Sequence, residues 1–450
     1  MSSAPPVAST SLADTELAGL TRDFLLEDFA RYGKPRARWR VGGEFERAVV
    51  RSDGRPVGYF EPDGIRWILE TMAARGGWTI VREGENPIAL QRAGAEITLE
   101  PGGQVELSGA PHTTLTALAD EMLQNRADLL ELTEGHDLVW TAAGLTPVAS
   151  IDSIPWVPKG RYDVMRNYLP QYGDRAVWMM KGTCSVQANY DYLDEEDCAR
   201  KVRLTSGLAP LTTAMFANSP VYEGKATGYK STRGHIWTRV DPARTGFPPA
   251  LRASYTHEGW VDYLLTVPMM FYKRAGTWTP ANGRTFHTFM TEGFDGQRAT
   301  LADWLLHQTS VFPEVRIKHT IEVRGADCVN HELAIAFCAL FTGLLYCNAA
   351  LDEGLALVAE IERHGTHAER FDIAARDALD GVIGGRTLAD WASDLGDIAE
   401  RGIHLCLPQD AHRLSPLLAM IEAGRCPADN VLDALARDPS PENLVRAMAY

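Results

Sequence analysis

The chain has 450 residues, with 44 Lys and Arg against 59 Asp and Glu, and a formal charge of −15. Its 45% apolar and 23% charged residues are typical of a globular protein and exclude a disordered, collagenous or coiled-coil chain. Because no basic stripe offsets the acidic balance, we expect small-molecule partners and neither a nucleic-acid nor a membrane partner.

The first residues carry no targeting signal that we can identify. Residues 1–20 are rich in Ser, Ala and Pro, predict a loose N-terminal segment, and lack the basic and apolar regions of a secretory signal. The longest apolar run, residues 333–346, is shorter than the roughly 20 residues that a membrane-spanning helix needs. The seven cysteines contain no CxxC pair, which indicates buried thiols in a reducing compartment. We expect a cytoplasmic protein, either a monomer or a homodimer.

The pattern along the chain predicts a mixed body followed by helices. Residues 21–330 combine strand-like and helical runs and form the predicted catalytic body. Residues 331–450 are almost wholly helical in pattern and are expected to pack on that body. The predicted fold class is therefore α+β. The phosphate-binding sequence GxxxxGK[ST] and the patterns GxGxxG, GxSxG and HExxH are absent, so any nucleotide chemistry must use another device.

Charged residues recur at alternate positions of the predicted strands. In RVGGEFER, residues 40–47, Glu44 and Glu46 share one face while Phe45 takes the other. Residues 97–107 predict a hairpin around Pro-Gly-Gly. A three-residue loop would put Glu100 and Glu106 on one face, and a two-residue turn would separate them; we expect the three-residue loop.

Two later strands continue this pattern. Gln187 and Asn189 align on one face of residues 184–189, and Glu322 and Arg324 align on one face of residues 320–324. Each pair alone is compatible with the solvated face of an antiparallel strand. Together, the five glutamates on one sheet face would repel strongly unless divalent cations offset their charge. Carboxylate and amide oxygens suit Mg²⁺, with Mn²⁺ as a second choice, and Mg²⁺ commonly accompanies nucleotide phosphates.

Basic residues near these strands are candidate substrate ligands. A guanidinium group pairs well with a carboxylate, which makes Arg161 and Arg166 candidates for an amino-acid α-carboxylate. Other basic side chains are placed to neutralise substrate carboxylates or ATP phosphates; these are Lys230, Arg233, Arg316 and Lys318. The alternative for all of them is a solvated surface charge or a surface ion pair.

Several long strings then resemble the plant-type glutamate–cysteine ligases, which also occur in proteobacteria. The resemblance spans about residues 36–346, with a weaker match beyond, and rests on RVGGEFER, ITLEPGGQVELSGAP, VPKGRYDVMRNYLP, KGTCSVQANYDY, FANSPVYEGKATGYKSTRGHIWT, VDYLLTVPMMF and FPEVRIKHTIEVRGAD. It implies a glutamine-synthetase-like curved antiparallel sheet whose concave face holds metal ions and ATP. It also implies formation of γ-glutamylcysteine through a γ-glutamyl phosphate, the first step of glutathione synthesis.

The resemblance also implies roles for individual residues. Gln187 and Asn189 fall in the family's metal- and nucleotide-binding strand, and Arg233 matches a substrate-binding arginine. The family's Mg²⁺ ligands fall at Glu44, Glu46, Glu100, Glu106 and Glu322. In the mechanism that we expect, Glu322 and Arg233 are catalytic, and fixed positive charge for phosphoryl transfer comes from Arg324, Arg316 and Lys318.

Two positions depart from the plant pattern. Met270 stands where the plant ligases have a tyrosine that contacts the cysteine substrate, so Met270 is a candidate substrate contact and the acceptor amine stays open. Ala119 falls near a plant regulatory cysteine, so Cys406 would lack that disulfide partner. Three hypotheses remain: a glutamate–cysteine ligase, a ligase of the same chemistry with another amine or acid, and a non-catalytic binding protein.

Overall fold

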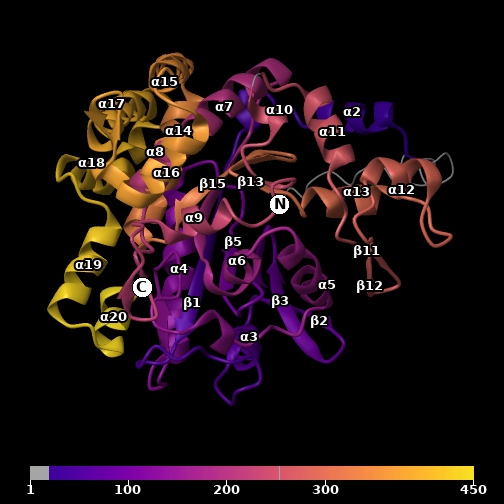
Figure 1. Ribbon diagram of the computed structural model, residues 1–450, viewed down its shortest axis with the longest axis horizontal. Coiled ribbons are helices and arrows are strands. Elements are labelled where there is room, and N and C mark those ends of the chain that lie inside the picture. Colours follow the sequence, from indigo (N-terminus) through magenta and orange to yellow (C-terminus); the bar gives the residue numbers. More distant parts are fainter. Residues whose placement is uncertain (1–19, 253) are drawn as a thin grey trace.

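A large antiparallel sheet lies at the centre of the protein (Figure 1). The computed structural model describes residues 20–252 and 254–450, so almost all of the predicted loose N-terminal segment lies outside the described residues. The strand order is β14-β15-β7-β1-β5-β4-β3-β2, and β6 pairs with the far half of β1. The strands are β1 (Val41–Val50), β2 (Thr79–Glu83), β3 (Asn86–Arg92), β4 (Ala95–Leu99), β5 (Val105–Ser108), β6 (Val139–Thr141), β7 (Ser185–Tyr190), β14 (Val315–Ile317) and β15 (Ile321–Asp327).

Helices and short hairpins of the first 330 residues surround this sheet. The longer helices are α2 (Arg22–Ala30), α3 (Ile65–Ala74), α4 (Leu115–Thr133), α5 (Gly160–Tyr168), α7 (Glu195–Gly207), α11 (His257–Thr266) and α13 (Leu301–Gln308). The shorter ones are α6 (Ala176–Gly182), α8 (Ala209–Met215), α9 (Thr232–Trp237), α10 (Pro249–Arg252) and α12 (Phe286–Glu292). The small strand pairs are β8 (Val221–Tyr222) with β9 (Lys225–Ala226), β10 (Thr245–Gly246) with β13 (Phe312–Pro313), and β11 (Phe271–Arg274) with β12 (Thr277–Pro280).

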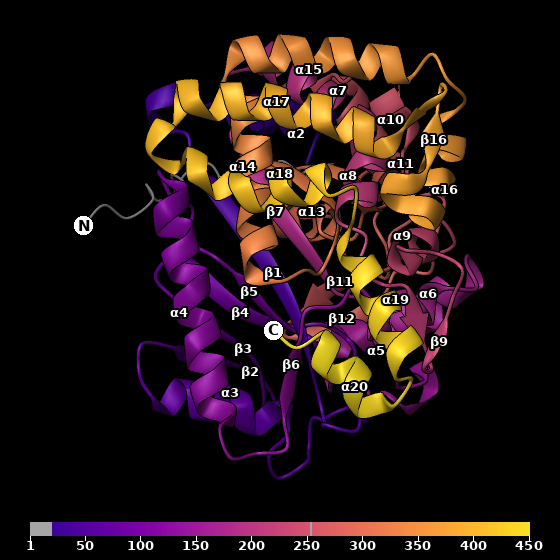
Figure 2. The same ribbon diagram turned by 90° about the vertical axis from the view of Figure 1, so that its left-hand side faces the viewer.

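The C-terminal residues are mainly helical and gather along one side of the molecule (Figures 1 and 2). Their helices are α14 (His331–Tyr346), α15 (Asn348–Ile361), α16 (His367–Asp377), α17 (Leu388–Cys406), α18 (Ser415–Glu422), α19 (Pro427–Arg437) and α20 (Pro441–Ala447). A short hairpin, β16 (Val382–Ile383) with β17 (Arg386–Thr387), precedes α17. Thr366 and Thr387 begin α16 and α17 with capping boxes, in which each threonine exchanges hydrogen bonds with the third helical residue.

The apolar face of the sheet builds the main core. Phe45, Leu107 and Val186 point to this face and pack in one cluster with residues of α4 and α14. Because α14 is almost wholly buried and contacts both β7 and α4, the C-terminal helices share a core with the sheet. The α+β class with an antiparallel sheet is confirmed, and all seven cysteines are free thiols, of which only Cys406 is partly exposed.

No single helix among residues 20–252 and 254–450 is long and apolar enough to cross a membrane. The pair α14 and α15 reaches the required length together, with a 100° bend between them.

The helices α14 and α17 approach so closely that glycine is required at their crossing. A Cβ atom on Gly402 would lie 2.2 Å from the carbonyl oxygen of Gly343 and 2.7 Å from Cβ of Ala350. A Cβ atom on Gly396, in the same helix, would meet only the end of the flexible Leu418 side chain, at 2.8 Å.

We therefore predict that Gly402→Ala lowers the free energy of unfolding by about 1–3 kcal/mol, because backbone on the opposite helix has no room to move. Gly396→Ala is the matched control, since Leu418 can change rotamer and alanine raises helix propensity, so its effect should stay below about 1 kcal/mol. Urea unfolding measures both. Equal effects for the two variants would contradict the predicted backbone crossing.

Candidate active site

The strand register places the predicted polar residues side by side on the face opposite the apolar core. Glu44 of β1 lies opposite Gln187 of β7, and Glu46 lies opposite Glu106 of β5. On the other side of β7, Asn189 lies opposite Glu322 of β15. The prediction that these side chains share one sheet face is confirmed.

The β4–β5 hairpin has the three-residue loop that was expected. Leu99 pairs with Val105, and the amide of Glu100 donates to the carbonyl oxygen of Gln104 at 2.9 Å, which leaves Pro-Gly-Gly as the loop. Gly103 has a φ of 90°, which glycine adopts without strain. Glu100 therefore shares a face with Glu106, and both line the same cavity.

This cavity, which we call the acidic cavity, has a volume of about 290 Å³ and lies over the polar face of the sheet. The carboxylates on its wall are Glu44, Glu46, Glu100 and Glu106. The basic side chains on its wall are Lys159, Arg161, Arg233, Arg316, Lys318 and Arg324. Asn189 lies behind this wall and donates to Glu44 at 2.8 Å, and Gln187 donates to Glu46 at 3.2 Å.

The surroundings of the glutamates of β1 and β5 disfavour the ionised carboxylate and raise the pKa values of these groups. Burial, and then the charges of Glu322 and Glu106, raise the pKa of Glu44 to about 7. Burial, followed by Glu106 and Glu100, raises the pKa of Glu46 to about 8. Burial and Glu100 also raise the pKa of Glu106, although Thr98 donates a hydrogen bond of 2.6 Å to it. Near neutral pH the carboxyl groups of Glu44 and Glu46 therefore favour a proton or a cation.

Glu322 is in a different electrostatic state. It is fully buried, and its carboxylate binds Arg316 through two hydrogen bonds of 2.8 and 2.9 Å, Lys318 at 3.2 Å, and Arg324. Burial alone would raise the pKa of Glu322, but the three cations lower it well below its ordinary value. In this structure Glu322 therefore holds three basic side chains in place, whereas the sequence predicted a metal ligand.

The acidic cavity has donor atoms that suit Mg²⁺. Among the described residues, no three His, Cys, Asp or Glu side chains already stand close enough together to hold a metal ion. The donor set nevertheless suits a hard cation, since carboxylate oxygens from Glu44, Glu46 and Glu106 face one cavity and have raised pKa values. The residues that line this cavity therefore fit a divalent cation in the chemistry of their donor atoms.

The predicted basic ligands divide into those that reach the acidic cavity and those that do not. Arg161 lines it, has a buried Nε atom without a hydrogen-bond partner, and lies 5.5 Å from the ring of Phe271. Arg166 is exposed and pairs with Asp163 at 2.9 Å. Lys230 pairs with Asp380 and Asp429, each at 2.6 Å. The predictions for Arg166 and Lys230 are therefore corrected, because both take the alternative ion-pair role away from the cavity wall.

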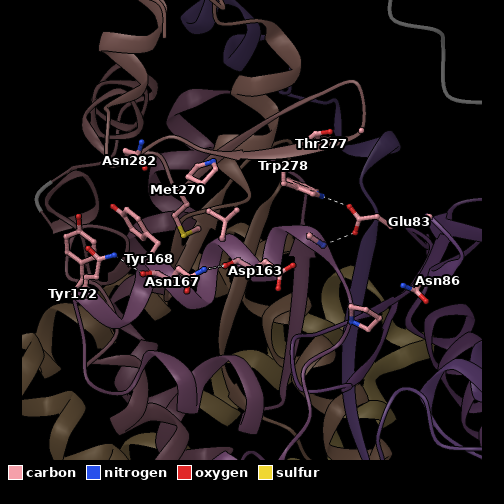
Figure 3. Close-up of a pocket in the computed structure, with 17 residues that line it drawn as sticks. Glu83, Asn86, Asp163, Asn167, Tyr168, Tyr172, Met270, Thr277, Trp278 and Asn282 are labelled. Carbon is pink, nitrogen blue, oxygen red and sulfur yellow. Dashed lines mark hydrogen bonds between the residues drawn. The ribbon is translucent and has the colours of Figure 1, made fainter. Parts of the chain in front are cut away.

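A second cavity lies on the other side of α5, between that helix and the β11–β12 hairpin (Figure 3). This outer cavity has a volume of about 940 Å³, and Met270, Tyr168 and Trp278 line it. Glu83 joins its walls by accepting hydrogen bonds from Trp278 at 2.6 Å and from the amide of Gly160 at 2.9 Å. Met270 therefore lines the outer cavity and not the acidic cavity.

Sequence reasoning missed Lys159 and Asp327. Lys159 lines the acidic cavity, and burial followed by the charge of Arg161 lowers its pKa to about 8. Asp327 is buried beneath Arg233 at the end of β15. The sequence held a clue to each residue, since Lys159 lies two residues before Arg161 and Asp327 ends the string EVRGAD. The alternation of side chains along one strand identifies neither residue as part of a site.

Comparisons of this chain with known proteins agree on one family. The sequence model of glutamate–cysteine ligase family 2 (GCS2) matches residues 40–448. The chloroplastic glutamate–cysteine ligase of Brassica juncea is 36% identical over 438 residues, which cover 96% of this chain and 84% of that protein. The chloroplastic glutamate–cysteine ligase B of Oryza sativa subsp. japonica is 36% identical over 422 residues, covering 92% and 84%.

The fold also matches a solved structure. The glutamate–cysteine ligase of Francisella tularensis, crystallised in complex with AMP, superposes with a TM-score of 0.56 at 14% sequence identity. The match covers 91% of this chain and 87% of that one. At this identity the likeness establishes the fold.

The raised pKa values of Glu44 and Glu46 predict how stability depends on pH. The folded protein keeps these protons up to about pH 7 and 8, whereas the unfolded chain releases them near 4.5. Their contribution to stability is therefore complete below about pH 4.5 and is lost as the pH rises through 7 to 8, with a slope of at most about 1.4 kcal/mol per pH unit for each group.

Urea unfolding in the presence of a chelator at several pH values measures this dependence. Glu46→Gln should reduce the loss of stability between about pH 5 and pH 8, since the amide cannot ionise. Glu96→Gln, which removes an exposed carboxylate of β4, is the matched control and should keep the wild-type slope. An unchanged slope in Glu46→Gln would contradict the prediction.

Proposed function

Because this chain belongs to glutamate–cysteine ligase family 2, we propose that it joins the γ-carboxyl group of glutamate to the amino group of cysteine and converts ATP to ADP and phosphate. The protein is a glutamate–cysteine ligase. The observation that carries the assignment is the acidic cavity, whose lining combines four carboxylates on one sheet face with six buried or half-buried basic side chains. This arrangement suits the transfer of a phosphoryl group to a carboxylate.

The first step is attack of an oxygen of the glutamate γ-carboxylate on the γ-phosphorus of ATP. The bond from that phosphorus to the β,γ-bridging oxygen breaks, and γ-glutamyl phosphate and ADP result. Arg316, Lys318 and Arg324 supply fixed positive charge at the cavity wall, and their pairing with Glu322 holds them there before substrate binds. Arg233 adds a fourth cation, and Arg161, which has no carboxylate partner among the described residues, pairs with the α-carboxylate of glutamate.

We further propose that the acidic cavity holds Mg²⁺, with Mn²⁺ as a possible substitute, through Glu44, Glu46, Glu100 and Glu106. When bound, the ion would offset the negative charge of the ATP phosphates. Gln187 and Asn189 orient these ligands through their hydrogen bonds to Glu46 and Glu44. Glu322 then acts through the three cations it binds.

In the second step the amino group of the acceptor attacks the acyl carbon and phosphate leaves, forming an amide. The acceptor is cysteine by family membership. A different amine is the second candidate, since Met270 lines an outer cavity of about 940 Å³ whose lining includes no Lys, Arg or His side chain among the described residues. We also propose that the enzyme is cytoplasmic, acts as a monomer or homodimer, and has only small-molecule partners.

Release of ADP in the presence of glutamate, ATP, Mg²⁺ and a panel of amines tests this proposal. Turnover that depends on cysteine supports the first acceptor, and turnover only with another amine supports the second. Absence of ADP release with every amine would overturn the ligase assignment.

Within this scheme we predict that Glu106→Gln lowers kcat at least about 100-fold, because it removes a carboxylate that holds the cation. It should also reduce the rise in thermal stability that Mg²⁺ gives the wild-type protein, a readout that is independent of turnover. Glu96→Gln, which changes an exposed carboxylate of the neighbouring strand, is the control and should retain both properties. Wild-type kcat in Glu106→Gln would remove this residue from the site.

A further inference from the structure

Asp327, at the end of β15, is a buried carboxylate that accepts hydrogen bonds from two separate segments of the chain. Its side chain accepts hydrogen bonds from the amide of Asn218 at 2.9 Å, the hydroxyl of Ser219 at 2.6 Å and the hydroxyl of Ser231 at 2.9 Å. A Cβ atom on Gly144 would lie 2.5 Å from Cγ of Asp327, so a third segment also packs directly against it. Only 1% of Asp327 is exposed, and it does not line the acidic cavity.

The same contacts lead to Arg233, which does line that cavity. A guanidinium nitrogen of Arg233 lies 3.8 Å from Asp327, and the other terminal nitrogen donates to the carbonyl oxygen of Arg324 at 3.0 Å. The backbone amide of Arg233 donates to the hydroxyl of Ser219 at 3.0 Å, so Ser219 connects Asp327 to the backbone of Arg233. Both the side chain and the main chain of Arg233 are thus tied to one carboxylate.

From these contacts we infer that Asp327 is a positioning residue for the ligase reaction, which fixes the guanidinium group of Arg233 in the acidic cavity before substrate binds. This inference rests on the proposed function. Arg233 is 5% exposed and has no closer carboxylate among the described residues, so without Asp327 its only polar side-chain anchor is a backbone carbonyl. A guanidinium group that is free to shift by about 1 Å would cost the reaction about 100-fold.

Asp327→Asn tests the inference, since asparagine has nearly the same shape but no charge. We expect kcat/KM for glutamate to fall by about 10- to 100-fold. If the loss acts through Arg233, Asp327→Asn should have almost no further effect in an Arg233→Ala background, because a double-mutant cycle reports coupling between the two side chains. Independent, multiplying losses would overturn the inference.

Chemical rescue supplies a readout that a purely structural role would not change. Free guanidinium ion should restore part of the activity of Arg233→Ala, where Asp327 can hold the ion in place, and should restore none in the double variant Asp327→Asn, Arg233→Ala. Equal rescue in both backgrounds would contradict the positioning role. Asp303→Asn, which removes a buried carboxylate paired with Arg274 at 2.6 Å, is the matched control and should leave the rescue of Arg233→Ala intact.

Ser219→Ala gives a second test if Asp327→Asn does not fold. It removes the hydroxyl that connects Asp327 with the amide of Arg233 and keeps the carboxylate, so we expect a smaller loss, about 2- to 10-fold, that is again absent in the Arg233→Ala background. A full Ser219→Ala loss in that background would overturn the inference. The wild-type assay with glutamate and cysteine comes first, because inactivity there would contradict the proposed function and not the role of Asp327.

Discussion

Repulsion among carboxylates on one sheet face is the constraint on which the site depends. The register of β1 with β5 brings Glu46 opposite Glu106, and burial strengthens their mutual repulsion by excluding water. Without a cation, the protein relieves this repulsion by keeping protons, which appears as a pKa of about 8 for Glu46. The same sheet supplies cations at its other end through the pairs of Glu322 with Arg316 and Arg324. The wall of the acidic cavity therefore carries both carboxylates and basic side chains.

The parts of this arrangement that follow from backbone geometry could be predicted from the sequence. Strand alternation placed Glu44 and Glu46 together because side chains two residues apart always share a face. The sequence left two loop lengths open between Glu100 and Glu106, and the positive φ of Gly103 belongs to the three-residue loop that was expected. The antiparallel α+β class followed equally from local patterns, since alternating strands precede a long helical region.

The sequence could not predict with which residue each long side chain forms an ion pair or hydrogen bond. Arg166 lies in the string VPKGRYDVMRNYLP, but its side chain is exposed on α5 and pairs with Asp163. Lys230 forms ion pairs with Asp380 and Asp429 of the C-terminal region. These residues are far away in the sequence, so a local sequence pattern does not predict the contacts. Asp327 was missed for the same reason, because its hydrogen-bond donors are more than 90 residues away in the chain.

Helix α5 contributes residues to both the acidic cavity and the outer cavity. Its first turn presents Arg161 to the acidic cavity, while Asp163 and Tyr168 face the outer cavity. The acidic cavity concentrates cations that suit phosphates and carboxylates, and the outer cavity has no basic side chain among the described residues that line it. Of these two cavities, the acidic cavity therefore carries the basic side chains that suit an anionic phosphoryl group.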